Sequence, residues 1–163
     1  KGSFYSRTKM ISEKMLNEFD TLQIRIRMPI DSVISDRNLL TKLLKYNKII
    51  NVENSITIIE DMLIVTKQLI ERNQSGIFNV VNKGVIKHDE LLKMFEEISG
   101  KPLNYELISL DALDKITKTG RSNCVLSTNK LESLGIKVPQ IRGSLIKCLT
   151  DYAMNMEATK ITT

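Results

Sequence analysis

The sequence has no tryptophan, and it is poor in several other residue types that commonly carry chemistry. Aromatic residues make up 5% of its 163 residues, and the basic residues are scattered rather than gathered in a run with aromatics between them. That pattern excludes a typical nucleic-acid interface, which concentrates lysine and arginine on one face. The formal net charge of +5 instead suits solvated surfaces, or one small phosphorylated ligand.

Cysteine and histidine are also scarce. Cys124 and Cys148 allow at most one disulfide, neither belongs to a CxxC motif, and His88 is the single histidine. These residues offer no metal-ligand spacing, so we expect no metal site and interpret both cysteines as core or strand residues. The low cysteine content favours a reducing, cytoplasmic compartment.

No apolar run approaches the length of a membrane span. The longest, such as Met62–Val65, fall far short of the roughly 20 residues of a transmembrane helix. No cationic leader followed by an apolar stretch and a small-residue cleavage site is visible. We therefore expect no membrane partner. Hydrophobic residues at 42% and charged residues at 26% are typical of one globular domain.

Helical and extended patterns alternate along the chain, which indicates the α/β class. Apolar residues at helical spacing predict helices over 6–19, 37–46, 57–73, 88–100, 111–117, 129–135 and 142–154. Alternating or β-branched residues predict strands over 22–28, 47–52, 76–82 and 104–110. We expect Pro29 to stop the first strand, Thr57 and Glu60 to cap a helix, and 155–163 to form a frayed tail.

Arg25 and Arg27 are unusual in a buried parallel strand, so they predict either a polar crevice or a partly uncovered strand.

No glycine-rich turn of the form GxGxxG or GxxGxxG occurs in the sequence, although a dinucleotide fingerprint requires one between its first strand and helix. The chain therefore shows no phosphate-cradling loop of its own.

What the sequence does contain is a tyrosine and a lysine four residues apart, Tyr5 and Lys9, near the start of its first expected helix. Such positions share one face of a helix. A phenol ordinarily has a pKa of about 10, and a neighbouring ammonium group lowers the pKa of a phenol by favouring the phenolate. A tyrosine in that setting can exchange a proton with a carbonyl or hydroxyl group. The spacing alone also arises by chance in many helices.

The segments that follow this pair carry a resemblance to a known family. They are "SFYSRTK", "RIRMPI", "RNLLTKLLKYNKIINVENSIT", "GIFNVVNKGVIKHDELL" and "RSNCVLSTNKLESLGI". With them the chain resembles the short-chain dehydrogenase/reductase superfamily in its extended, sugar-nucleotide-modifying branch. It is most similar to the dTDP-4-dehydrorhamnose reductase group, and within it to the bifunctional UDP-4-keto-6-deoxyglucose 3,5-epimerase/4-reductases of UDP-L-rhamnose synthesis.

The resemblance implies the later part of a doubly wound, Rossmann-type parallel sheet with a small α/β substrate domain, and the N-terminal cofactor-binding half absent. It implies five parts along the chain. They are the end of the dinucleotide-binding domain (1–34), a substrate-domain insertion (35–56), a return helix and strand of the sheet (57–83), the sugar-nucleotide domain (84–154) and a tail (155–163). The chain alone is therefore expected to be inactive.

The same resemblance implies NADPH- or NADH-dependent reduction of a nucleotide-linked 4-keto-6-deoxyhexose, with 3,5-epimerisation. It favours a UDP-linked over a dTDP-linked sugar and is compatible with a homodimer. Tyr5 would be the general acid, while Lys9 would hold the nicotinamide ribose and tune the tyrosine. Pro29 and Ile30 would contact the cofactor, unless they only end a strand. The alternative is a non-catalytic sugar-nucleotide-binding or regulatory subunit on the same fold.

Three further residues match ligand-side positions in these enzymes. Lys42 would transfer a proton during epimerisation, which for a lysine requires burial or suitable neighbours, or it is a solvated helix residue. Asn38 would contact the sugar nucleotide, or cap its helix. Arg121 would bind the diphosphate through its fork of donors. Ser122 stands where proline is commoner in these enzymes, which puts the rigidity of that loop in doubt.

Overall fold

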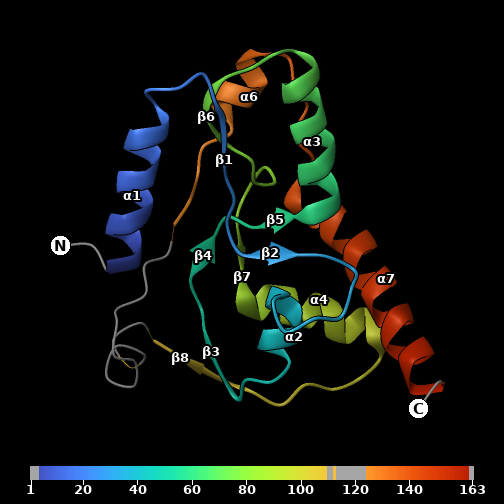
Figure 1. The fold of residues 1–163 in the computed structure, drawn as a ribbon. Helices are drawn as coiled ribbons and strands as arrows, with labels where there is room; N and C mark the ends of the chain where they lie inside the picture. Colours follow the sequence, from blue (N-terminus) through green and yellow to red (C-terminus); the bar gives the residue numbers. More distant parts are fainter. Residues whose placement is uncertain (1–3, 110–111, 113–123, 162–163) are drawn as a thin grey trace.

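The computed structural model of the chain describes residues 4–109, 112 and 124–161. Its longer helices are α1 (Phe4–Leu16), α3 (Ile59–Glu71), α4 (His88–Ser99) and α7 (Ile141–Ile161), and its short ones are α2 (Leu39–Leu43) and α6 (Asn129–Ser133). The strands are β1 (Leu22–Arg25), β2 (Pro29–Ile30), β3 (Lys48–Ile50), β4 (Glu53–Asn54), β5 (Thr57–Ile58), β6 (Gly76–Asn79), β7 (Ile86–Lys87) and β8 (Glu106–Ile108). In Figure 1, α1 and α7 lie on opposite sides of the strands.

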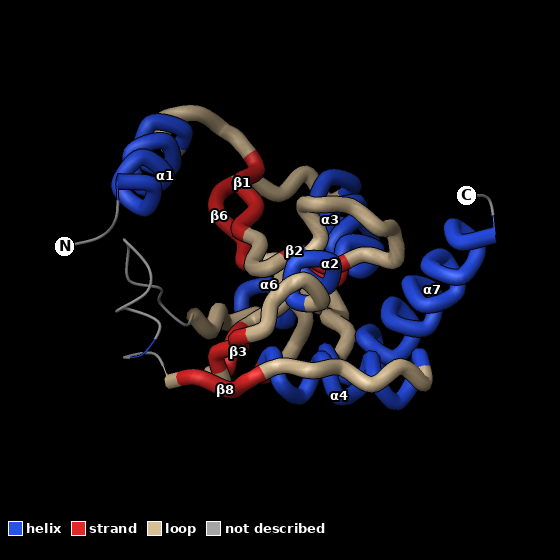
Figure 2. Tube along the Cα trace, turned by 90° about the horizontal axis from the view of Figure 1, so that it is seen from below, coloured by secondary structure: helices blue, strands red, loops and turns tan. Residues whose placement is uncertain are grey.

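The described strands pair two by two. β1 pairs with β6, β2 with β5 and β3 with β8 in parallel, while β4 and β7 are antiparallel. In Figure 2 the pairs β1–β6 and β3–β8 lie apart from one another, drawn in red. Parallel strands connected through helices define the α/β class, so the predicted class is confirmed.

The larger core cluster gathers β2, α2, β3, α4 and α7 around aliphatic side chains such as Ile49 and Leu92. The ring of Phe95 on α4 meets that of Tyr152 on α7 edge to face, with centroids 5.8 Å apart. The Tyr152 hydroxyl lies 2.7 Å from Thr41 Oγ1, and both residues are buried. This hydrogen bond joins the long C-terminal helix to the short helix α2.

A smaller cluster fixes the β1–β6 pair. Val65 and Leu69 of α3 pack with Phe78 of β6 and Leu131 of α6. These apolar residues occupy one side of α3, as the helical spacing predicts. Each strand pair contributes at least one residue to these two clusters.

Several predicted elements are confirmed. The strands expected over 47–52, 76–82 and 104–110 appear as β3, β6 and β8. The helix expected over 88–100 appears as α4 and ends at Gly100, whose φ of 65° lies in the left-handed region. Glycine adopts that conformation without the steric cost that other residues carry. The helix expected over 111–117 lies largely outside the described residues.

The prediction that Pro29 stops the first strand is wrong. β1 already ends at Arg25, and Met28 then adopts a φ of 44°, in the left-handed region that L-residues seldom occupy. After this turn Pro29 and Ile30 form β2, parallel to β5. Ile30 is fully buried there, so its place beside β5 stabilises a strand that the local sequence does not favour.

The predicted capping box is also wrong. Thr57 lies in β5, and α3 begins only at Ile59, without a side-chain cap. The Thr57 hydroxyl accepts a hydrogen bond from the Arg27 backbone N–H and donates one to the Val80 carbonyl, each at 3.0 Å. Because the hydroxyl is buried between the segments that follow β1 and β6, it satisfies their backbone instead of the helix end.

The frayed tail predicted for 155–163 is wrong over residues 155–161, where α7 continues. Asn155 Nδ2 donates to the Ser32 carbonyl at 2.9 Å, Met156 packs on the larger cluster, and Glu157 lies 3.6 Å from the Lys101 ammonium. Tertiary contacts thus hold turns that propensity alone does not specify. Within the described part of the chain, no helix is long and apolar enough to cross a membrane.

Candidate functional site

Tyr5 and Lys9 lie on one face of α1, as their spacing predicts. The Lys9 ammonium is 5.7 Å from the centroid of the Tyr5 ring, within the range of a cation–π contact. Tyr5 is 69% exposed, and Lys9 is exposed as well. The helix therefore presents a phenol and an ammonium group together on an accessible surface, where a ligand can reach both.

The helix that carries this pair is held by polar contacts, since no residue of α1 is buried. The Arg25 guanidinium of β1 donates to both carboxylate oxygens of Glu13, at 2.5 and 2.6 Å. Gln23 Nε2 donates to Asn17 Oδ1 at 2.9 Å. Of the two alternatives for the arginines, Arg25 therefore fits a partly uncovered strand. Arg27 points elsewhere and donates to Asn54 Oδ1 at 3.0 Å.

We expect Arg25→Gln to loosen α1, because it removes the paired contact with Glu13. Exposed ion pairs contribute little, so hydrogen–deuterium exchange of the α1 amides should accelerate roughly two- to five-fold. The hydrogen bonds from Arg25 lower the pKa of Glu13 from its ordinary 4.5. The stabilisation is therefore complete above that ordinary value and is lost as the pH falls through the lowered pKa.

Arg72→Gln is the matched control for this variant. Arg72 donates to the Leu134 carbonyl at 2.6 Å, between α3 and the end of α6, and has no role at α1 in this structure. Its loss should leave α1 exchange unchanged. Equal α1 exchange in Arg25→Gln and the unmodified chain would show that the ion pair does not hold the helix.

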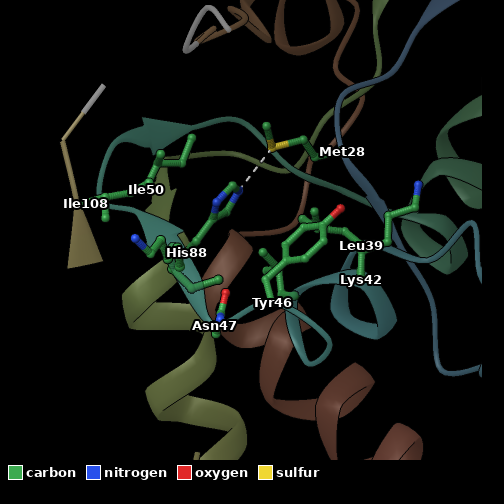
Figure 3. A pocket seen from close by; sticks show the side chains of 11 residues that line it. Met28, Leu39, Lys42, Tyr46, Asn47, Ile50, His88 and Ile108 are labelled. Atoms are coloured by element: carbon green, nitrogen blue, oxygen red, sulfur yellow. Dashed lines mark hydrogen bonds between the residues drawn. The ribbon is translucent and has the colours of Figure 1, made fainter. Parts of the chain in front are cut away.

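A pocket of about 370 Å³ opens among α2, β3, β8 and the start of α4. We call it the His88 pocket; it is lined by Met28, Leu39, Lys42, Leu43, Tyr46, Asn47, Lys48, Ile49, Ile50, His88 and Ile108. Six of these residues are leucine, isoleucine or methionine and five carry polar groups, and such a mixture is found in sites that bind small organic ligands. Figure 3 shows Ile50 and Ile108 on one side of His88 and Tyr46 and Lys42 on the other.

His88 and Met28 face one another at this pocket (Figure 3). His88 is 4% exposed, at the first position of α4, and its Nε2 lies 3.4 Å from Met28 Sδ. The left-handed φ of Met28 turns the chain between β1 and β2, and its thioether lies along the pocket wall. Neither residue was predicted as a ligand contact from the sequence. Because they lie 60 positions apart, no local spacing could have indicated their contact.

Lys42 lines the His88 pocket, whereas Tyr5, Lys9, Pro29 and Asn38 are not among its lining residues. The Lys42 side chain is exposed and its ammonium points away from His88 (Figure 3). The burial that would assist proton transfer by a lysine is therefore not provided by the described residues. The role of Lys42 in epimerisation stays a prediction. The structure adds that this residue lines a pocket.

Two predicted contacts have alternative explanations in the structure. Asn38 is buried, and its Oδ1 accepts the Leu40 N–H at 3.0 Å as a helix cap. Its amide donates to the carbonyls of Asp31 and Val33, at 2.8 and 2.9 Å, so the capping alternative accounts for its polar atoms. Ile30 belongs to the larger core cluster, which favours the strand alternative over a cofactor contact.

The remaining candidates lie away from the pocket or outside the described residues. Arg121 lies outside them, and its diphosphate contact stays a prediction. Cys124 and Cys148 are both free thiols. Cys148 is part of the larger core cluster, where burial raises the pKa of its thiol to about 12. Among the residues that the structure describes, no three His, Cys, Asp or Glu side chains form a metal-binding group.

Comparisons with known proteins confirm the resemblance. No protein-family model matches the chain. It is 36% identical over 148 residues to a trifunctional UDP-glucose 4,6-dehydratase/UDP-4-keto-6-deoxy-D-glucose 3,5-epimerase/UDP-4-keto-L-rhamnose-reductase of Arabidopsis thaliana, covering 90% of this chain and 22% of that protein. It is 34% identical over 148 residues to the bifunctional dTDP-4-dehydrorhamnose 3,5-epimerase/dTDP-4-dehydrorhamnose reductase of the same plant. The chain spans about half of that relative, 49% of its length.

Solved structures show a similar arrangement of elements. The UDP-rhamnose synthase of Acanthamoeba polyphaga mimivirus superposes with a TM-score of 0.85 at 34% identity, over 93% of this chain and 53% of that one. The dTDP-4-dehydrorhamnose reductase of Bacillus anthracis, solved in complex with NADP, gives a TM-score of 0.71 at 16% identity, over 88% of this chain and 53% of that one. At that identity the second likeness shows the fold alone, and it supports the predicted Rossmann-type class.

Proposed function

We propose that this chain is the tyrosine-bearing half of a reductase that acts on a nucleotide-linked 4-keto-6-deoxyhexose with NADPH or NADH, and that also epimerises the sugar at C3 and C5. The observation that carries the proposal is the accessible pairing of Tyr5 and Lys9 on α1. The named activities of the relatives, which share the chain over 90% of its length, supply the substrate class. A UDP-linked sugar is favoured over a dTDP-linked one.

The chemistry of reduction suits the Tyr5 and Lys9 side chains. Lys9 and Pro29 would hold a nicotinamide cofactor, whose chemistry would be to supply a hydride to the carbonyl carbon at C4. The Tyr5 hydroxyl gives its proton to the carbonyl oxygen, which completes the alcohol and leaves a phenolate. The Lys9 ammonium stabilises that phenolate by its positive charge, and its remaining N–H donors fit a ribose hydroxyl. Pro29, at the turn after β1, is the further candidate for a cofactor contact.

Epimerisation makes a different demand on the protein. Moving a proton next to a ketone needs a base on one face of the sugar and an acid on the other. Lys42 is the candidate for one of these roles because it stands at the His88 pocket. The helix α2, which carries Lys42, is fixed by the Asn38 cap and by the hydrogen bond between Thr41 and Tyr152. These contacts fix the position of the Lys42 backbone beside the pocket.

We propose that the chain divides as its sequence suggests. Residues 1–34 and 57–83 would belong to the sheet side and 35–56 and 84–154 to the sugar-nucleotide side. The His88 pocket supports this division, because its lining comes from 39–50, 88 and 108, with Met28 added from the other side.

The proposal predicts activity that depends on a second half. A form of the enzyme that joins this chain to a cofactor-binding half should oxidise NADPH when given a UDP-4-keto-6-deoxyhexose, followed by the loss of nicotinamide absorbance. The 163-residue chain by itself should bind NADPH only weakly in calorimetry, because its sequence has no glycine-rich turn. Micromolar NADPH binding by the chain alone would contradict the division, and no turnover by the joined form would contradict the reductase.

A further inference from the structure

We infer that Arg25 is a positioning residue for the proposed reduction. By binding the Glu13 carboxylate, it keeps that acid away from the Lys9 ammonium, which stays beside the ring of Tyr5. The inference rests on the proposed function, which makes Tyr5 the general acid and Lys9 its partner. It adds the residue that determines which neighbour the lysine contacts.

The face of α1 that carries Tyr5 and Lys9 also carries an acid. Residues 5, 9 and 13 follow one another at intervals of four, so Lys9 lies between the phenol and the Glu13 carboxylate on one side of the helix. Glu13 is the single acidic residue of α1. A lysine in this position can contact either neighbour. Only the contact with Tyr5 stabilises the phenolate that reduction leaves.

The same spacing forms an ion pair on another helix of the chain. On α3, Lys67 and Glu71 are also four residues apart with the lysine first, and their charged atoms lie 3.7 Å apart. In the part of the chain that the structure describes, Lys9 makes no corresponding ion pair, and its ammonium lies 5.7 Å from the centroid of the Tyr5 ring. Helical spacing alone therefore does not determine the partner of Lys9.

The difference between the two helices is Arg25, which occupies the carboxylate on α1. Its Nε and Nη2 donate to the two oxygens of Glu13, at 2.5 and 2.6 Å. A planar fork of N–H donors binds a carboxylate more strongly and with a more defined geometry than a lysine does. These hydrogen bonds also lower the pKa of Glu13, so its carboxylate is charged at neutral pH. The acid that could pair with Lys9 is therefore held at β1.

The other charged groups of α1 do not take part in this competition. At about 3.6 residues per turn, Arg7 and Lys14 lie on the side of the helix opposite Tyr5. Among the ion pairs of the described residues, the one between Arg25 and Glu13 joins α1 to another element. In Figure 1 the helix stands beside β1, the strand that carries Arg25.

Two variants that break the same ion pair separate positioning from simple support of the helix. In the form joined to a cofactor-binding half, Arg25→Gln releases Glu13 to Lys9, so at saturating NADPH it should lower kcat roughly two- to five-fold, the strength of an exposed ion pair. Glu13→Gln removes the competing acid and should keep normal turnover. The double variant Arg25→Gln/Glu13→Gln should regain it. Equal losses in the two single variants, no loss in Arg25→Gln, or no recovery in the double variant would overturn the inference.

Two further variants control for the charge and for the type of substitution. Arg25→Lys keeps a cation against Glu13 and should retain most of the turnover. Arg72→Gln makes the same chemical change as Arg25→Gln at the contact with the Leu134 carbonyl, away from α1, and should leave kcat unchanged. A loss in Arg72→Gln equal to that in Arg25→Gln would contradict a specific role for Arg25.

A labelling measurement on the 163-residue chain tests the charge arrangement without turnover. Acetic anhydride modifies lysine amines, and mass spectrometry gives the rate at each lysine. Arg25→Gln should slow the acetylation of Lys9 roughly two-fold or more, because its amine is then paired with Glu13. Glu13→Gln should not slow it, and Lys14, on the opposite side of α1, should react at one rate in all forms. An unchanged Lys9 rate in Arg25→Gln would overturn the inference.

The outcomes separate this inference from the proposed function. No turnover in the unmodified joined form would refute the reductase, while slower acetylation of Lys9 in Arg25→Gln would still show that Arg25 withholds Glu13 from the lysine. Normal turnover together with unchanged Lys9 acetylation in Arg25→Gln would refute the role of Arg25 and leave the reductase standing.

Discussion

Replacing Tyr5 with phenylalanine should lower carbonyl reduction roughly 10²–10⁴-fold, the usual contribution of a general acid. The variant keeps the ring and its contact with the Lys9 ammonium, and removes only the hydroxyl that gives its proton to the sugar. Because the side chain is exposed and α1 has no buried residue, folding should be unaffected. The measurement is NADPH oxidation with a UDP-4-keto-6-deoxyhexose, in a form that includes a cofactor-binding half.

Tyr105→Phe is the control with the same chemical change. The Tyr105 hydroxyl donates to Asp89 Oδ1 at 2.8 Å, and burial and this carboxylate raise the pKa of its phenol to about 12. It therefore stays protonated and remote from α1, and its loss should leave turnover close to normal. Near-normal turnover in Tyr5→Phe would reject Tyr5 as the general acid of the reduction.

Replacing Lys42 with alanine should lower formation of epimerised product roughly 10²-fold or more, because it removes one proton-transfer group. Reduction of a ketone that is already epimerised should fall much less, since Tyr5 supplies that proton. Both substrates can be assayed in one joined form, with the products separated by chromatography. Equal loss of the two steps would show that Lys42 has no separate role in epimerisation.

Two further variants separate charge from proton transfer at this position. Lys42→Arg keeps a positive charge but does not release its proton, so it should epimerise as poorly as Lys42→Ala. Lys45→Ala is the positional control. Lys45 follows α2, is exposed, pairs with Asp36 at 2.7 Å and does not line the pocket, so both steps should continue in its absence.

The parts of the fold that the sequence predicted are those with local causes. α4 is recognisable because its apolar residues recur at helical spacing and Gly100 ends it in a left-handed conformation. The predictions that were wrong concern residues whose structure depends on partners far away in the sequence. The Thr57 hydroxyl bonds to the segments that follow β1 and β6, Pro29 forms a strand beside β5, and Asn155 donates to the Ser32 carbonyl. Sequence spacing carries no information about such partners.

The same distinction applies to the candidate site. Tyr5 and Lys9 lie four residues apart, so helical geometry alone placed them together. Asn38 could be assigned either to a cap or to a ligand from its position, and only its three hydrogen-bond partners distinguish these roles. The His88 pocket could not be predicted from the sequence, because its walls come from four segments that meet only in the folded chain.

The distance along the chain between Met28 and His88 has a consequence for folding kinetics. Their contact closes a loop of 60 residues, and the hydrogen bond between Thr41 and Tyr152 that fixes α2 closes one of 111. Each closure costs chain entropy before the contact stabilises the fold, and such non-local contacts slow folding. The pocket should therefore form late, after α3 and α4 are in place. The imidazole signals of His88 would then mark, during refolding, the moment at which the pocket closes.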